Sequence, residues 1–158
     1  MSVSFHIEQQ SDKSVAVYVQ SAGPRVLAAM HNALKQWVNQ GAALSAQKYF
    51  GSGAGGARDK RNPGSVLNAR TGALRASVLA SADSGVDPAS ADATTTVITA
   101  TWGADTPYAR IQEYGGAAGR GHKTQIPPRP YLQPAFDEQR GTLATLLQSA
   151  VDQALGEL

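Results

Sequence analysis

Two neighbouring motifs decide how this chain folds, TPYARIQEYGG at residues 106–116 and IPPRPYLQPAF at residues 126–136. Thr106 suits the N-cap of a helix, and Pro107 suits the first helical position, where a missing N–H costs nothing. Gly115 or Gly116 can take the left-handed conformation that ends a helix. The first motif therefore predicts a compact helix of about two turns.

The second motif is dominated by proline. Its prolines stand at positions 127, 128, 130 and 134, and each fixes its own φ and pushes the preceding residue toward an extended conformation. We therefore expect an extended, proline-rich strut over residues 117–130. Pro134 suits the first turn of a last helix, in which Asp137 and Glu138 favour the positive end of the helix dipole.

Apolar periodicity predicts two long helices outside these motifs. The first begins at Gly23-Pro24, ends at Gly51, and carries apolar residues at three- and four-residue intervals: Leu27, Met30, Leu34, Trp37, Val38 and Leu44. Gly41 lies inside it and can permit close packing or a slight bend. The second helix, from about Pro134 to Leu158, carries Phe136, Leu143, Leu146, Leu147, Val151, Leu155 and Leu158.

Alternating patterns predict the strands of a sheet. Apolar and polar residues alternate over residues 3–8, and valine occupies every second position over residues 15–19. Residues 94–102 form a third alternating stretch, which is rich in threonine. We expect a helical turn from Thr71 to Arg75, then a strand at 76–82 and a polar connection at 83–92. The sequence thus predicts a single α+β domain over residues 1–158, with a small, mostly antiparallel sheet packed against two long helices.

Composition removes several classes of function. The chain has 158 residues and no cysteine, so disulfides, thiolate catalysis and cysteine metal sites are excluded. No apolar run approaches the roughly 18 residues of a membrane span, and the N-terminus lacks the apolar core of a signal peptide. We expect no membrane partner and assembly in a bacterial cytoplasm.

The net charge of +2 is unevenly placed along the chain. Residues 51–65 form a glycine-rich stretch without periodicity, which predicts a long mobile loop. This loop carries Arg58, Lys60 and Arg61, and a second basic stretch carries Arg120 and Lys123, whereas Asp83, Asp87 and Asp92 fall in a stretch without Lys or Arg. We expect the cations to contact a neighbouring subunit or DNA; solvated loops are the alternative.

No arrangement of residues predicts catalysis or a cofactor. The sequence GSGAGG at 51–56 matches a dinucleotide fingerprint, but a helix precedes it and no helix start follows, so we reject nucleotide binding. His6, His31 and His122 lack metal-ligand spacing. We therefore expect neither an enzyme, a cofactor nor a metal site.

Three motifs in order carry a family resemblance. RTGALRAS at residues 70–77, YARIQEYGG at 108–116 and IPPRPYLQPA at 126–135 resemble tailed-bacteriophage tail-completion proteins, also labelled minor tail components or virion-morphogenesis proteins. The motif positions are Arg70, Thr71, Gly72, Leu74, Arg75, Tyr108, Ile111, Glu113, Tyr114, Gly115, Gly116, Arg129, Pro130, Tyr131 and Leu132. The sequence departs from the family pattern in two ways. Residues 120–125 contain a single histidine in place of a histidine-rich cluster, and the N-terminus predicts a pair of strands where a more helical start is expected.

The resemblance implies a structural virion protein at the head–tail joint, or neck. Such a protein would assemble as a ring, in the family setting a hexamer, with the tail tube, tail terminator and head connector as partners. Within it, Tyr108, Tyr114, Tyr131 and Leu132 would pack the strut onto the body, and Glu113 and Arg129 would anchor their segments by charge-assisted hydrogen bonds.

Other interpretations stay open at this point. One is a tail terminator or another ring protein of the neck. A second, of a different class, is an accessory protein that contacts DNA without sequence preference through its basic loops. A third is that the motifs at Gly72, Gly115 and Pro130 serve only to determine the fold.

Overall fold

The computed structural model describes residues 4–11, 14–20, 22–51, 67–68, 72–80, 83–87 and 95–156. The glycine-rich loop predicted at 51–65 lies, except for Gly51, outside the described residues. So do Arg58, Lys60, Arg61, Arg70, Thr71 and Asp92, which the sequence singled out.

The main sheet has four strands in the order β1-β2-β6-β5, and every neighbouring pair is antiparallel. Its strands are β1 (Ser4–Ser11), β2 (Ser14–Gln20), β6 (Thr95–Thr101) and β5 (Asp83–Asp87). The predicted pairing of the first two strands and the threonine-rich strand are both confirmed. Two short strands, β3 (Phe50–Gly51) and β4 (Leu67–Asn68), form a separate parallel pair.

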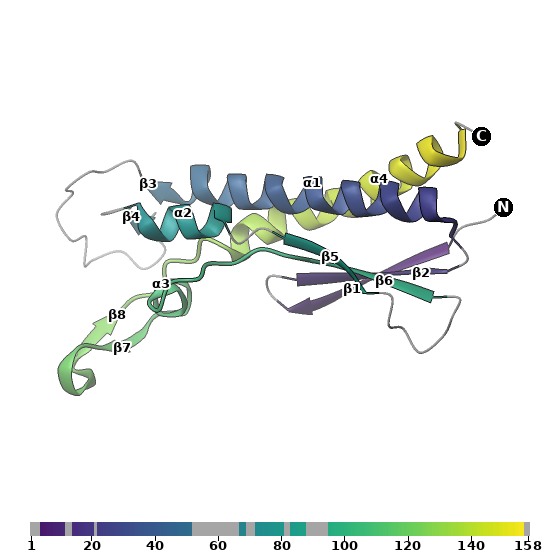
Figure 1. Cartoon of the computed structure of the whole chain (residues 1–158). Helices are drawn as coiled ribbons and strands as arrows, with labels where there is room; N and C mark the ends of the chain where they lie inside the picture. The colour runs from purple at the N-terminus through teal and green to yellow at the C-terminus, as the bar shows by residue number, and fades with distance from the viewer. Residues whose placement is uncertain are drawn as a thin grey trace.

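Two long helices lie together on one side of this sheet (Figure 1). They are α1 (Pro24–Lys48) and α4 (Gln133–Gly156). Gly23 precedes α1 with an extended backbone, and Pro24 occupies its first turn, where the missing N–H is harmless. The apolar stripes predicted for both helices supply the core, with Met30, Leu34, Trp37, Phe136, Leu143 and Leu147 fully buried. The predicted α+β class is confirmed.

The end of α1 is tied to the start of α4 by a polar contact at the surface. Lys48 Nζ donates a hydrogen bond to Glu138 Oε1 at 2.5 Å, and the Tyr49 hydroxyl donates to the same oxygen. These bonds lower the pKa of Glu138, and the bond to Glu138 raises the pKa of Lys48. Because the pair is exposed, we expect it to orient the helices more than it stabilises them.

An aromatic cluster fills the space between the helices and the sheet. Trp102, which follows β6, packs edge-on against Trp37 with ring centroids 5.0 Å apart. Its ring is tilted against that of Phe136, with centroids 5.4 Å apart. An added Cβ on Gly41 would lie 2.9 Å from two carbons of the Trp102 ring. Gly41 therefore gives α1 the close packing that its position in the helix had indicated.

This geometry predicts opposite effects for two glycine-to-alanine substitutions. Gly141→Ala, exposed in α4 with open space around its Cβ, should raise the free energy of unfolding by roughly 0.5–1 kcal/mol, because alanine is the better helix former. Gly41→Ala gains the same propensity but overpacks the Trp102 ring, so we expect a net loss of up to about 2 kcal/mol. Urea unfolding of both variants measures the difference. Equal stabilisation would mean that the indole ring moves aside freely.

Two elements differ from the prediction. The prediction of a strand at residues 76–82 is wrong, because the chain is helical in α2 (Ala73–Ala80). Gly72, at φ 73°, precedes this helix, and Leu74 and Val78, one turn apart, are buried on the same face. The polar connection expected at 83–92 is also wrong in part, because residues 83–87 form β5. Its sequence, DSGVD, has low strand propensity, and the open edge of β6 determines its structure.

No helix among the described residues is long and apolar enough to cross a membrane.

Candidate functional site

The motifs at 106–136 fold into one projecting feature, shown at the lower left of Figure 1. It begins with α3 (Ala109–Tyr114), which starts later than the predicted first helical position at Pro107. The Ala109 N–H donates to the carbonyl of Thr106, so residues 106–108 make a turn before the helix. Thr106 was expected to cap α3, but the structure places Tyr108 at the N-cap position and gives it no side-chain cap.

Beyond α3 the chain makes a hairpin where an extended strut was expected. Strands β7 (Gly116–Ala118) and β8 (Thr124–Ile126) pair antiparallel, and a short 3-10 turn, η1 (Arg120–His122), joins them. Gly119 and Gly121 have φ of 79° and 70°, a region that side chains disfavour. These glycines permit a tight reversal, so the extended proline segment is limited to residues 127–130. We call residues 116–126 the hairpin arm.

At the base of the arm, the backbone at the end of α3 lies directly against the backbone of the proline segment. Gly115 has φ 71°, and a Cβ there would lie 2.8 Å from the Ile126 carbonyl oxygen and the Pro128 nitrogen. The Arg129 N–H donates to the Gln112 carbonyl at 2.8 Å. Gly116 lies against Ile111, whose Cγ1 would be 3.7 Å from an added Cβ. The glycine pair thus serves to join the end of α3 to the proline segment.

Glu113 anchors the arm to the body. This residue is only 3% exposed, and its carboxylate accepts three backbone hydrogen bonds. Oε2 accepts from the N–H groups of Tyr131 at 2.8 Å and Leu132 at 3.1 Å, and Oε1 accepts from Gln133 at 2.9 Å. Because α4 begins at Gln133, the carboxylate satisfies N–H groups at a helix start that have no partner within the helix, and it lies at the positive end of the helix dipole.

The segment that Glu113 holds is buried on its other side. Tyr131 and Leu132 are both 0% exposed, and the Ser45 hydroxyl of α1 donates to the Tyr131 carbonyl at 2.6 Å. Burial raises the pKa of the Tyr131 hydroxyl, and the nearby Glu113 charge adds to the shift. The sequence missed Ser45, because a serine on an apolar helix face is indistinguishable from a solvated one until its partner is known.

The tyrosines of the first motif do not share this burial. Tyr108 is 42% exposed and Tyr114 is 50% exposed. The expectation that they pack the segment onto the body is therefore wrong, and only Tyr131 and Leu132 do so. The α3 helix is short, and its buried residues are Ala109 and Glu113, so residues one position before Ala109 and one after Glu113 face outward.

The remaining motif residues are divided between two places. Leu74 is buried in the main core, whereas Arg75 is exposed on α2. Arg129 is half-buried beside α3, and Pro130 is exposed. Arg120 and Lys123 are exposed at the tip of the hairpin arm, together with His122. The tip of the two-stranded hairpin therefore exposes three basic side chains close together in the sequence.

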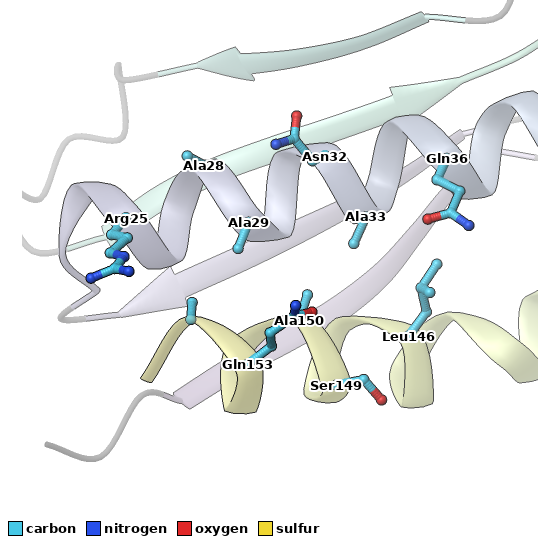
Figure 2. Close-up of a pocket in the computed structure, with 11 residues that line it drawn as sticks. Arg25, Ala28, Ala29, Asn32, Ala33, Gln36, Leu146, Ser149, Ala150 and Gln153 are labelled. Carbon is cyan, nitrogen blue, oxygen red and sulfur yellow. The ribbon is translucent and has the colours of Figure 1, made fainter. Parts of the chain in front are cut away.

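A second surface feature is a groove of about 490 Å³ between α1 and α4 (Figure 2). Small residues line it, among them Ala29, Ala33, Ala150 and Ala154, with Arg25 at one end. The sequence signal for this groove is the pair of alanines spaced four residues apart in each helix, Ala29 and Ala33 in α1 and Ala150 and Ala154 in α4. Among the described residues, no group of three His, Cys, Asp or Glu could hold a metal ion.

Comparison with known proteins gives one short match. No protein-family model and no solved structure matches the chain. The protein "Mu-like prophage FluMu G protein 2" of Haemophilus influenzae is 57% identical to it over 30 residues. The matched segment covers 19% of this chain and 22% of that protein, so about a fifth of each is compared. The similarity supports a phage-related origin for this chain.

Proposed function

We propose that this chain is a structural virion protein of a tailed phage or prophage that completes the tail at the head–tail joint. In this role it joins a closed ring with further copies of itself and acts by assembly. The ring finishes the end of the tail, so that a filled head can attach. Its neighbours would be the tail tube, the tail terminator and the head connector, and its place would be the neck of the virion.

The observation that carries this proposal is the anchored hairpin arm. Two of the three motifs that resemble the tail-completion family, at residues 108–116 and 126–135, form one unit, in which the Glu113 carboxylate accepts hydrogen bonds from the backbone of Tyr131, Leu132 and Gln133. An exposed arm held rigidly at its root suits a contact between subunits, because less freedom is lost on association. The 30-residue match to a Mu-like prophage protein adds a phage setting.

Deletion of the gene in a phage that carries it tests the proposal. We expect DNA-filled heads and separate tails of near-normal length in electron micrographs, because head attachment would fail after both parts are built. Supplying the wild-type chain from a plasmid is the control and should restore joined particles. Overlong tails would indicate a tail terminator, and normal infectious particles would contradict any role in the neck.

A second candidate is favoured by the basic tip of the arm. Arg120, His122 and Lys123 are exposed together, and mobile cations suffice for phosphate contacts without sequence preference. An accessory protein that contacts DNA would bind duplex DNA as a monomer, with an affinity that falls steeply as salt increases. Fluorescence anisotropy with a labelled duplex separates this candidate from the structural one.

A further inference from the structure

The exposed charge of the projecting feature is all of one sign. Residues 106–130 contain a single carboxylate, that of Glu113, and it is buried and bonded to the backbone at the start of α4. By contrast, Arg110 on α3 and Arg120 and Lys123 at the tip of the hairpin arm are exposed. Because no exposed carboxylate of this segment offsets these cations, the partner that they favour is an anion.

The arm lacks the side chains that anchor a contact between proteins. Over residues 116–125, GAAGRGHKTQ, the largest apolar side chain is the methyl group of alanine. The core of a protein interface is instead built from aromatic and other large side chains that fill pockets of the partner. Contacts to nucleic-acid phosphates need only cations and polar donors. The composition of the arm therefore favours a nucleic acid over an acidic protein surface.

The shape of the arm selects duplex DNA. Strands β7 and β8 pair antiparallel as a two-stranded ribbon, and no side chain of β7 is larger than a methyl group. Paired strands lie about 4.8 Å apart, and the major groove of B-DNA, about 12 Å wide, admits a two-stranded ribbon. The minor groove is only about 6 Å wide, too narrow for two strands and their side chains. The small residues of β7 permit a close approach to the groove.

The arm is held so that its tip can reach a groove before the rest of the molecule meets the duplex. The ribbon stands off from the long helices and from the four-stranded sheet (Figure 1). Its reversal at Gly119 and Gly121 places Arg120, His122 and Lys123 at the far end. The hydrogen bonds to Glu113 fix the base, so less conformational freedom is lost when the tip binds.

We propose that the hairpin arm binds in the major groove of duplex DNA, with Arg120 and Lys123 against the phosphates that border the groove. Because phosphates carry no sequence information, the contact has little preference among sequences. The inference goes beyond the neck proposal and does not require a ring. It rests on the second candidate function, contact with DNA, and gives that contact a defined site and groove.

Neutralising the tip tests the phosphate contacts in the full-length protein. Fluorescence anisotropy with a labelled duplex of mixed sequence gives the affinity at several salt concentrations. We expect R120A/K123A to weaken binding at low salt at least about tenfold and to reduce the slope of log affinity against log salt by roughly 2, because two phosphate contacts are lost. K35A/R75A removes the same residue types from exposed positions on α1 and α2 and should change neither quantity.

Dimethyl sulfate footprinting of the wild-type complex tests the groove without any variant. This reagent methylates guanine N7, which lies in the major groove, and adenine N3, which lies in the minor groove. At saturating protein we expect weaker methylation at N7 and unchanged methylation at N3. Protection of N3 alone, or of neither atom, would overturn the major-groove contact.

Polyglutamate distinguishes DNA from an acidic protein surface. This polymer carries negative charge at similar density but has no groove, so it should compete with the duplex poorly. Competition as strong as that of unlabelled duplex would mean that charge alone is recognised, and the inference would be wrong.

The outcomes also separate this inference from the functions proposed above. If the wild-type protein and R120A/K123A bind the duplex equally, other cations make the contact, and the second candidate function survives without the arm. If the wild-type protein fails to bind the duplex at low salt, the second candidate and the inference fail together. In both cases the neck proposal stands, because the deletion phage tests it.

Discussion

Replacing Glu113 with alanine should destabilise the protein by roughly 2–6 kcal/mol, since leaving a buried N–H without a partner costs about 1–3 kcal/mol and Tyr131 and Leu132 would each lose theirs. The third donor, Gln133, is only half-buried and can be hydrated. Urea unfolding measures the change in free energy. Amide hydrogen exchange should show faster exchange at residues 131–133, because these N–H groups bond directly to the carboxylate.

Glu113→Gln provides the graded comparison. Its amide oxygen can replace Oε2 and keep the bonds from Tyr131 and Leu132, but its NH₂ group then faces the N–H of Gln133. We expect stability between that of the wild type and that of Glu113→Ala. Asp105→Ala removes an exposed carboxylate that precedes α3 in the sequence and should change stability by less than about 0.5 kcal/mol. Equal stability of all three variants would show that the carboxylate does not hold the start of α4.

Leu132→Ala is the second substitution for which we expect a large effect. Leu132 is fully buried next to the first turn of α4, so truncation removes transfer free energy and leaves a cavity, at a cost of roughly 2–5 kcal/mol. Thermal unfolding should show a melting temperature lower by about 2–4 °C for each kcal/mol lost. A melting temperature equal to that of the wild type would mean that the proline segment does not pack on the body.

Two variants make the Leu132 result specific. Leu132→Met keeps most of the volume and should lose less than about 1.5 kcal/mol. Tyr108→Ala removes a larger side chain from the first motif, but Tyr108 is 42% exposed, so we expect a change within about 0.5 kcal/mol. A larger loss for Tyr108→Ala than for Leu132→Ala would reverse the assignment of buried and exposed residues in this segment.

Local patterns were sufficient where burial follows a regular period. The stripes on α1 and α4 and the alternating residues of β1, β2 and β6 predicted these elements because each has one face in the core. A glycine at position 41, inside a predicted helix, indicated close packing, and the structure shows that the Trp102 indole ring is the group that packs there. In these elements a single sequence carries the needed information, because the periodicity of the backbone selects the apolar positions.

The errors occur where a distant partner decides the structure. Residues 76–80 are mostly apolar and include the β-branched Val78, which suits a strand, but packing of Leu74 and Val78 against the core makes them helical. Residues 83–87 have little strand propensity, and pairing with β6 makes them a strand. The prolines that follow the hairpin arm predict an extended strut through it. The arm reverses instead because Gly119 and Gly121 adopt positive φ, and a sequence does not show which glycines will do so.

The sequence by itself determined the two long helices, three strands of the sheet and the order of the motifs on which the proposed function rests. Only the tertiary structure decided that Glu113 binds the start of α4, that Ser45 binds the Tyr131 carbonyl, and that residues 116–126 form a projecting hairpin. The physical reason is the range of the interactions. Periodic burial is local and recurs within a few residues, whereas a carboxylate bonded to backbone eighteen residues away has no signature until the chain has folded.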